Sequence, residues 1–569
     1  MKLTWQLAQA DPAQVEFLVK VLRVSPCLAK VLINRGLTDP KQVAEFFAPT
    51  INNLRDPKEI PGLIKAAERV LLAKQQGERV VVFGDYDVDG VSATAIMIET
   101  LKLLGIKTSY HIPHRHKEGY GLSIPVIEQL AASGAKLIIT VDCGIANYAE
   151  IKRAADLGLE VIVTDHHNLP AKLPKAVAIV NPKMIEADHP SKELAGAGVA
   201  FKFAWGLLRL AGIKDSKFLI SLLDLAALGT LADVVPLHLE NRIIAVLGMR
   251  VINERTRLGI KALVQAASLP EQITVNNVYF SLAPRLNAAG RLEHAKLAAE
   301  LLLTNDSVRA SELASFLQQT NVKRQEIGDE IRAEVFAQIN DQYLTNNRLV
   351  LLAGAGWHPG VIGITASKVV DEYFRPAVLV GVADGVGRGS ARSVAGVNIF
   401  ELLKSCADLF THFGGHSGAA GFSILEDNLP ELTVRLRETA NQNISAYDLA
   451  PKLVLEAEIS LVELSLSLVQ QFAQLEPYGQ GNSQPVFLSR NLKILDMKKV
   501  GKDGRHFKAK FCANDIILDT IAFSKGSWVD ELSYDQTYDL AYRLEANEWN
   551  GFVNVQLSLV DIREAEPTR

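Results

Sequence analysis

Between residues 79 and 180, short apolar runs alternate with longer stretches of helical character. The apolar runs are RVVVF, KTSYHI, KLIITV, EVIVT and AVAIV, and the stretches between them include SATAIMIETLKLL, IPVIEQLAAS and YAEIKRAADLG. This alternation predicts an α/β fold with a mostly parallel, doubly wound sheet, because parallel neighbours must be joined by a crossover that is usually a helix. Ligands of such sheets bind outside the carboxyl ends of the strands. We therefore expect a functional site at that edge of the sheet.

Four acidic motifs are candidates for this site: GDYDVDG at 84–90, VDCG at 141–144, TDHH at 164–167 and LADVVP at 231–236. The first three directly follow apolar runs, so we expect their side chains to meet at one sheet edge. Carboxylates with one or two imidazoles suit Mn²⁺ or Mg²⁺, whereas thiolates would indicate zinc. The motifs therefore predict a metal site.

Two other interpretations of the acidic residues are open. The run Asp85-x-Asp87-x-Asp89-Gly90 resembles the start of an EF-hand loop, but that loop needs a Glu at position twelve, which is Ile96 here, and a helix rather than a strand before it. The acids could also cap helices or be solvated in loops. Four motifs at matching positions favour the metal site over both.

The number of carboxylates predicts two ions. A single divalent cation would leave a strongly repelling cluster of acids: Asp85, Asp87, Asp89, Asp142 and Asp233. Two ions about 3.5 to 4 Å apart would neutralise the cluster and support in-line displacement at a phosphoryl group.

In their order along the chain, the four motifs resemble those of the DHH phosphoesterase family. The resemblance implies that Asp142 bridges two ions, that Asp87 helps to hold one of them, and that the other is held by Asp89, His166 and Asp233. It also implies that His167 faces the scissile phosphate and that the catalytic residues are Asp142, His166 and His167.

The first motif departs from the wider family. Many members carry a His four residues before the second Asp of this motif, and Phe83 occupies that position here. We expect Asp85 to replace the missing imidazole, and Asp165 to orient the histidines from behind, as partners of metal-bound imidazoles usually do.

Outside the acidic motifs, the patterns divide the chain into five regions. Residues 196 to 265 have broad apolar helical faces, 307 to 340 form one long charged helical pattern, 349 to 425 repeat an α/β pattern, and the remainder is rich in strands. The predicted regions are a helical packing region at 1–75, a DHH catalytic domain at 76–305, a connecting helix at 306–342, a DHH-associated domain at 343–445 and an OB-fold barrel at 452–565.

Two glycine-rich stretches in the second α/β region are candidate substrate contacts. GVGRGSARS at 385–393 offers glycine amides together with Arg388, Ser390 and Arg392, which are groups that bind phosphate. FGGHSGAAG at 413–421 resembles the GGH signature of the DHH-associated domain, whose histidine, here His416, contacts substrate. The alternative is that both stretches are ordinary turns.

Two more segments indicate a polymeric substrate. IPHRHKEGYGL at 112–122 joins a charge, Arg115, to an aromatic ring, Tyr120, on which a base can stack. PRLNAAGR at 284–291 places Arg285, Asn287 and Arg291 where they can bind a phosphate or cap a helix.

The strand-rich region carries a basic patch: Lys493, Lys498, Lys499, Lys502, Arg505, His506, Lys508 and Lys510. Phe507 and Phe511 lie among them. Cations interleaved with aromatic rings on a small barrel are typical of single-strand binding, and a solvated face is the alternative.

Within the DHH family, the domain order resembles the bacterial exonucleases that degrade single-stranded DNA from 5′ to 3′. This resemblance implies release of 5′-mononucleotides, a role in recombination and repair, and association with single-stranded-DNA-binding protein and a helicase. A DHH phosphodiesterase for short RNA or cyclic dinucleotides and a non-catalytic DNA-binding scaffold are the alternatives.

The cellular location follows from what the sequence lacks. The first residues show no secretory pattern, no apolar run is long enough to span a membrane, and the four cysteines have no C-x-x-C spacing. We expect a cytoplasmic monomer without membrane association.

Overall fold

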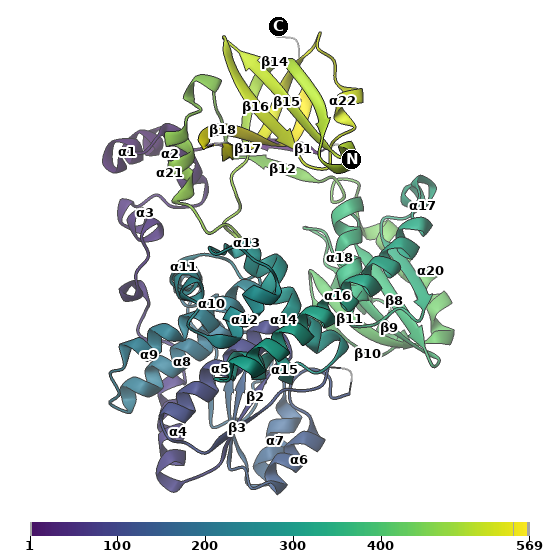
Figure 1. The fold of residues 1–569 in the computed structure, drawn as a ribbon. Coiled ribbons are helices and arrows are strands. Elements are labelled where there is room, and N and C mark those ends of the chain that lie inside the picture. Colours follow the sequence, from purple (N-terminus) through teal and green to yellow (C-terminus); the bar gives the residue numbers. More distant parts are fainter. Residues whose placement is uncertain (1–2, 116, 550, 566–569) are drawn as a thin grey trace. The chain divides into compact units, whose positions relative to one another are not determined.

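The computed structural model describes residues 3–115, 117–549 and 551–565, which form two compact units (Figure 1). One unit is Thr50–Leu449, and the other combines Met1–Pro49 with Ala450–Arg569. None of the helices in the described ranges has the length and apolar character needed to cross a membrane.

The first sheet of the Thr50–Leu449 unit is parallel throughout, which confirms the prediction. Its strands run in the order β3-β2-β4-β5-β6. Their bounds are β2 (Val80–Gly84), β3 (Thr108–His111), β4 (Leu137–Val141), β5 (Glu160–Thr164) and β6 (Ala178–Val180). The chain extends the sheet from β2 to β3 on one side and then crosses back to β4 on the other. The switch point of the sheet is therefore between β2 and β4, where open α/β sheets bind their ligands.

Helices cover both faces of this sheet. Alternate strand residues such as Val82 and Ile139 face a layer that starts with α4 (Leu63–Gln76), α5 (Val88–Leu103) and α8 (Gly196–Leu210). The residues between them, such as Val81 and Ile138, face α6 (Ile124–Ala132) and α7 (Tyr148–Asp156).

The expected helical extension continues the first layer. It comprises α9 (Ser216–Ser221), α10 (Leu223–Ala232), α11 (Leu239–Glu254), α12 (Leu258–Ala266), α13 (Val275–Asn277), a π-helical turn at Val278–Leu282, α14 (Ala283–Leu292) and α15 (Lys296–Leu303). A buried ion pair joins α8 to α11. The Nζ atom of Lys202 lies 2.7 Å from Oε1 of Glu240, and both side chains are 0% exposed.

The long helix α16 (Ser307–Gln338) belongs to two cores. Leu313 and Leu317 pack in the core of the first sheet, and Ile331 and Val335 pack in the core of the second. A short helix, α17 (Asp341–Asn346), follows it.

The second sheet has the order β10-β11-β9-β8-β7, in which only β7 and β8 are parallel among the described strands. Its elements are β7 (Val350–Ala355), α18 (Ile362–Tyr373), β8 (Ala377–Ala383), β9 (Val386–Arg392), α19 (Ile399–Lys404), β10 (Phe410–His416), β11 (Ala419–Leu425) and α20 (Leu429–Asn443).

The other unit contains a closed barrel, as the strand-rich pattern predicted. Its strands pair in the order β14-β15-β16-β18-β17, and β17 closes on β14, while β13 adds to the edge of β14. The elements are β12 (Lys452–Leu455), β13 (Ala457–Glu458), α21 (Leu466–Ala473), β14 (Phe487–Val500), β15 (His506–Ala513), β16 (Ile516–Ala522), α22 (Trp528–Glu531), β17 (Thr537–Trp549) and β18 (Phe552–Glu564).

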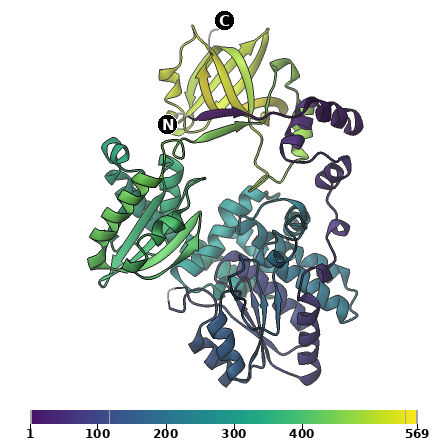
Figure 2. The same cartoon turned by 180° about the vertical axis from the view of Figure 1, so that it is seen from behind.

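Residues 3–49 pack with this barrel, which differs from the expected packing of residues 1–75 on the catalytic core. Strand β1 (Thr4–Leu7) pairs in parallel with β12 (Figure 2). Leu18 and Leu28 lie in one apolar cluster with Phe487 and Phe507 of the barrel. Only residues from 50 onward, including α4, join the catalytic unit.

The three N-terminal helices have strong local start signals. Each begins with Pro at its first position after a capping residue, and the helices are α1 (Pro12–Leu22), α2 (Pro26–Asn34) and α3 (Pro40–Phe47). The side chains of Asp11, Ser25 and Asp39 accept hydrogen bonds from amides of the first turn. This arrangement satisfies otherwise free amides and presets the helical φ angle.

Candidate active site

The four acidic motifs meet at the switch point of the first sheet. Asp85, Asp87 and Asp142 offer oxygens within 4.8 Å of one another, and they follow β2 and β4. A second such group is Asp89, His166 and Asp233. The two groups are adjacent, because Nε2 of His166 lies 3.1 Å from Oδ1 of Asp142.

The chemistry of this cluster fits divalent cations. Asp85 Oδ1, Asp142 Oδ1 and His166 Nε2 are buried and make no hydrogen bond within the described residues. Such buried polar atoms are costly unless a ligand satisfies them. Oxygen donors with one imidazole are the set that Mn²⁺ and Mg²⁺ prefer.

The electrostatics of the cluster support the same conclusion. Burial, and then the neighbouring carboxylates, raise the pKa of Asp89 to about 7 and that of Asp233 to about 8. The same causes raise the pKa of Asp142. Burial, and then the nearby His167, lower the pKa of His166 to about 3, so its ring is neutral and can act as a ligand. The carboxylates can all ionise together only with cations between them.

Asp89 is held by the N-terminus of α8, a contact that the sequence analysis missed. The amides of Gly196 and Ala197 donate to the two carboxylate oxygens of Asp89 at 2.7 and 2.8 Å. A Cβ at Gly196 would lie 2.6 Å from Oδ1 of Asp142, and one at Gly229 would lie 2.5 Å from Oδ1 of Asp89. Glycine is therefore required at both positions. For Gly196, the repeated glycines of AGAG at 195–198 were the feature of the sequence that could have indicated this close approach.

Asp142 has a left-handed backbone conformation, with φ of 60°. Non-glycine residues adopt this region at a cost, and they are concentrated at functional sites. Thr140 supports the turn, because its hydroxyl donates to the Cys143 carbonyl at 2.8 Å.

In the triplet at 165–167, Asp165 orients the two histidines. Oδ1 of Asp165 accepts from the amides of His166 and His167 and from Nδ1 of His167 at 2.7 Å. Burial alone would lower the pKa of His167, but the bond to Asp165 raises it to about 9. The hydroxyl of Tyr120 also lies 3.2 Å from Nδ1 of His167. Asp165 thus orients His167 directly, and it contacts His166 only through the backbone.

Phe83 is fully buried and stacks on His111, with ring centroids 5.1 Å apart. Its ring is therefore part of the strand packing. Asp85 lies in one group of possible metal ligands with Asp87 and Asp142. This is the position at which we expected it to replace the missing imidazole.

A second cluster, composed of arginines and a serine, lies in the same unit. NH1 of Arg392 donates to the Ser390 hydroxyl at 3.2 Å, and NH1 of Arg291 donates to the Gly360 carbonyl at 3.0 Å. Burial, and then the charges of Arg115, Arg324 and Arg392, lower the pKa of Arg291 to about 9.

The surroundings of this cluster orient its side chains. The guanidinium group of Arg115 lies 4.9 Å from the ring centroid of Tyr86. The backbone at Gly363, near the start of α18, comes so close that a Cβ there would lie 2.8 Å from the Ser390 hydroxyl. Several guanidinium groups gathered beside a hydroxyl group suit the binding of an anion.

Most of the stretch at 385–393 is a strand, which corrects its interpretation as a source of free glycine amides. Residues 386–392 form β9, whose backbone pairs with β8 on one side and β11 on the other. Gly389 is needed because the Phe422 ring would lie 2.1 Å from a Cβ there. Arg388, Ser390 and Arg392 alternate with these small residues and share one face of the sheet.

His416 lies in the same row of this sheet as Arg392. It pairs with Ala419 on β11, which pairs in turn with Arg392 on β9. Directly opposite residues project to the same face, and two strand spacings separate the two side chains by about 10 Å. A Cβ at Gly414 would meet nothing within 4 Å, so the face beside His416 is open.

Asn287 and Arg285, both predicted substrate contacts, make hydrogen bonds within the protein. Oδ1 of Asn287 accepts from the amide of Val88 at 3.2 Å and so helps to fix the first motif. Arg285 donates from Nε to Gln318 at 2.6 Å and from NH1 to the Ser281 carbonyl at 2.7 Å.

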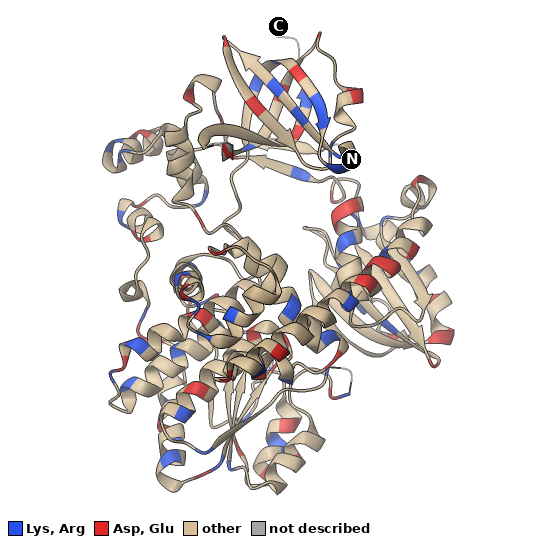
Figure 3. Ribbon diagram, viewed as in Figure 1, with Lys and Arg blue, Asp and Glu red and all other residues tan. Residues whose placement is uncertain are grey.

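The basic patch on the barrel is less uniform than its sequence indicated (Figure 3). Lys498 pairs across the strands with Lys508, but Lys510 lies opposite both Asp496 and Asp519. Phe507 and Phe511 are 0% exposed and belong to the barrel core, so they are not stacking platforms. Phe523 is 58% exposed and contacts the His506 ring at 5.4 Å between centroids.

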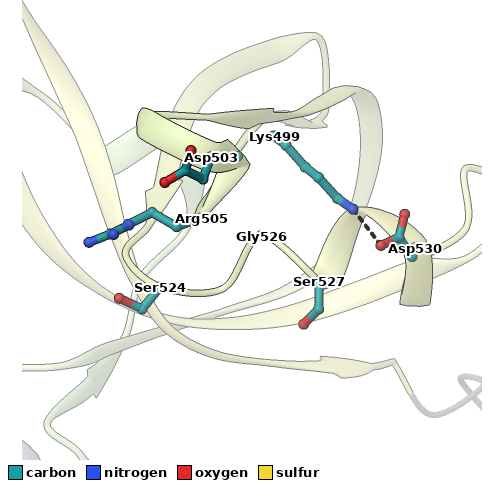
Figure 4. A pocket seen from close by; sticks show the side chains of 8 residues that line it. Lys499, Asp503, Arg505, Ser524, Gly526, Ser527 and Asp530 are labelled. Carbon is teal, nitrogen blue, oxygen red and sulfur yellow. Dashed lines mark hydrogen bonds and ion pairs between the residues drawn. The ribbon is translucent and has the colours of Figure 1, made fainter.

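One end of the patch borders a pocket of about 470 Å³ (Figure 4). Nζ of Lys499 lies 2.6 Å from Oδ2 of Asp530 in this pocket, so its charge is compensated. Arg505 also lines the pocket.

This fold and this site define a DHH phosphoesterase, and comparison with known proteins supports the class. Family models match for the DHH N-terminal domain at 79–230, the DHHA1 domain at 344–442 and the RecJ OB domain at 455–561. The single-stranded-DNA-specific exonuclease RecJ of Bacillus subtilis is 38% identical over 99% of this chain and 71% of its own length. The corresponding protein of Escherichia coli is 34% identical over 94% of this chain and 96% of its length. The chain belongs to the RecJ family.

A solved structure agrees with this assignment. RecJ from Thermus thermophilus in complex with Mn²⁺ matches with a TM-score of 0.87 and 31% identity, over 99% of this chain and 80% of the other. A structure of RecJ from the same organism in complex with Mg²⁺ matches with a TM-score of 0.80.

Proposed function

We propose that this chain is a metal-dependent exonuclease that hydrolyses single-stranded DNA from 5′ to 3′ and releases 5′-mononucleotides. The observation that carries the proposal is the pairing of the carboxylate cluster with the cluster of Arg115, Arg291, Ser390 and Arg392. The relatives named above are single-stranded-DNA-specific exonucleases. A terminal phosphate carries more charge than an internal phosphodiester, so a group of arginines beside the metal site favours a strand end.

In the proposed site, Asp85, Asp87 and Asp142 would hold one Mn²⁺ or Mg²⁺ ion. Asp89, His166 and Asp233 would hold a second ion, to which Asp142 would also contribute. Bound ions supply Lewis acidity and an activated water for in-line displacement at phosphorus.

The remaining side chains of the site bind and orient the substrate. Because Nδ1 of His167 is held by Asp165, its Nε2 is directed to the scissile phosphate and donates a proton or a hydrogen bond there. The Tyr120 ring, 47% exposed, stacks on a base. Arg388 and His416, on the same sheet face as Arg392, contact the sugar-phosphate backbone of the DNA.

The wider assignment rests on the family. We propose that the barrel binds the strand, that the enzyme acts as a cytoplasmic monomer in recombination and repair, and that it cooperates with single-stranded-DNA-binding protein and a helicase.

A time course on 5′- and 3′-labelled single and double strands, with Mn²⁺ or Mg²⁺, tests the proposal. We expect mononucleotides from the 5′ end of single strands only. Asp142→Ala should abolish hydrolysis and leave DNA binding largely intact, and Asp156→Ala, on the exposed side of α7, is the matched control. Hydrolysis confined to dinucleotides, or DNA binding without any hydrolysis by the unchanged protein, would overturn it.

A further inference from the structure

The loop between β3 and α6, which carries Arg115 and Tyr120, is closed by a glutamate that has no assigned role. Oε2 of Glu118 lies 2.8 Å from Nε2 of His111, the last residue of β3. Oε1 of Glu118 accepts from the amide of His114 at 3.0 Å. The two carboxylate oxygens therefore tie the end of the strand and the start of the turn to one side chain.

A backbone hydrogen bond joins the same two residues. The amide of Glu118 donates to the His114 carbonyl at 2.8 Å, in addition to the bond from the His114 amide to the Glu118 side chain. Arg115 lies inside this turn, directly after the amide that Glu118 holds. Its guanidinium group then reaches the Tyr86 ring within the first metal motif. The Glu118 contacts therefore hold the backbone on both sides of Arg115.

After Glu118, two glycines allow backbone conformations that other residues rarely adopt. Gly119 and Gly121 have φ of 85° and 75°, which glycine adopts without the usual steric cost. The next fixed points are Tyr120, whose hydroxyl donates to the Asp142 carbonyl at 3.3 Å, and Leu122, whose amide donates to Oδ1 of Asn147 at 3.3 Å. Without Glu118, the turn that carries Arg115 would lose the two side-chain hydrogen bonds that join it to His111 and to the His114 amide.

His111 and His114, the two partners of Glu118, also lie near both functional clusters. His111 stacks on Phe83, which directly precedes Gly84 and Asp85. The His114 ring contacts the His294 ring at 5.6 Å between centroids, and His294 lies just after α14, which carries Arg291. Burial favours a higher pKa for Glu118, but the bonds from His114 and His111 outweigh it and lower the pKa. The carboxylate is ionised at neutral pH.

We propose that Glu118 is a positioning residue: with His111 it forms a clasp that aims Arg115 at the phosphate of the strand beside the metal site. The proposal rests on the proposed function, because Arg115 is assigned there to a DNA phosphate. It adds that the aim of Arg115 depends on one carboxylate that touches neither substrate nor metal.

A double-mutant cycle between Glu118 and Arg115 tests the clasp. The first readout is the affinity for a 5′-phosphorylated single strand without divalent ions, and the second is the KM for the same strand with Mn²⁺. Losing a charge-assisted bond to phosphate weakens binding by about 10-fold or more. We expect Arg115→Ala and Glu118→Ala each to show a loss of this size, and the double variant to lose little more than either. The kcat should change by less than about 3-fold.

Two further variants separate positioning from a general loss of structure. Glu118→Gln keeps an oxygen for the His114 amide and a polar contact to His111, and it should restore affinity to within about 3-fold. Glu128→Ala removes an exposed glutamate of the adjacent helix α6, which pairs with Arg153, and it should leave affinity unchanged.

The outcomes distinguish the clasp from the proposed function. If Glu118→Ala weakens binding by the same factor with Arg115 present or absent, or if Arg115→Ala has no effect on binding, the clasp is refuted. Failure of the unchanged protein to hydrolyse any strand would instead refute the exonuclease assignment, and the binding cycle would still decide the clasp.

Discussion

The contact between α8 and the carboxylate cluster makes Gly196→Ala a sharp probe of the site. A Cβ at this position would lie 2.6 Å from Oδ1 of Asp142 and 2.7 Å from two of its carbon atoms. Ordinary van der Waals contact begins at 3.4 Å, so the overlap is 0.8 Å (3.4 − 2.6). Rotation of the Asp142 side chain cannot relieve the clash, because its Cβ, which the backbone positions, itself lies 2.7 Å from the added Cβ. Either Asp142 or the start of α8 must therefore move.

A shift of 0.8 Å exceeds the tolerance of about 0.5 Å within which a functional site keeps its geometry. If α8 moves, the bonds from Gly196 and Ala197 to Asp89, now 2.7 and 2.8 Å, stretch to 3.5 Å or more. One hydrogen bond to a charged group is worth about 1.5 to 3 kcal/mol. We expect the affinity for Mn²⁺ to fall by about 2 kcal/mol, which is roughly 30-fold in Kd.

Titration calorimetry or electron paramagnetic resonance with Mn²⁺ measures this change. Gly328→Ala, on α16, is the control: a Cβ there meets only Val361 at 3.4 Å, and loss of a helical glycine stabilises by about 1 kcal/mol. The unfolding midpoint of Gly196→Ala reports any general cost of overpacking. A Kd for Mn²⁺ within 2-fold of the unchanged protein would refute the role assigned to the start of α8.

Three further outcomes follow from the charges of the catalytic unit. Because the pKa values of Asp89 and Asp233 are raised to about 7 and about 8, the metal-free fold binds more protons than the unfolded chain above about pH 4, and its stability falls as pH rises to about 8. Mn²⁺ should therefore raise Tm more at pH 8 than at pH 6, as thermal scans would show. Lys202→Met leaves the buried Glu240 without its cation and should lower the free energy of unfolding in urea by about 3 to 5 kcal/mol. Arg324→Ala should reduce the salt dependence of DNA binding by about one phosphate contact, because the Arg324 guanidinium group donates to the neutral side chain of Asn321 at 2.6 Å.

Each outcome has a result that contradicts it. A Tm increment independent of pH would mean that the carboxylates are not protonated in the metal-free fold. An unfolding free energy unchanged in Lys202→Met would mean that Glu240 is satisfied by its other partners. An equal loss of salt dependence in Arg332→Ala, whose side chain already pairs with Asp329, would make the Arg324 effect non-specific.

Local periodicity predicted the catalytic sheet and most of its site. Runs such as KLIITV specify a buried strand, and parallel pairing brings the residues after each strand to one edge. Asp87, Asp142 and His166 could therefore be grouped from their positions alone. The contact of Asp89 with the amides of Gly196 and Ala197 could not, because it depends on how a helix more than a hundred residues later approaches the edge.

The glycine-rich segments were harder to interpret for a physical reason. Glycine is unfavourable in strands, so GVGRGSARS has the composition of a turn. Its strand conformation is imposed by the neighbours β8 and β11 and by the Phe422 ring that packs over Gly389. Tertiary packing has thus overridden the local preference, while the face with Arg388, Ser390 and Arg392 keeps the residues that the pattern singled out.

The pairing of β1 with β12 has a consequence for how the protein is made. Residues 3–49 are synthesised before the 50–449 unit, yet the strands and apolar side chains that pack on them lie after residue 449. The 50–449 unit contains all of its own core residues and can fold during synthesis, since domains generally fold as units. Leu18 and Leu28 of the N-terminal segment therefore stay exposed until the barrel has been synthesised. A message truncated near codon 450 would yield a folded catalytic unit bearing an unprotected apolar arm, a natural target for chaperones and proteases.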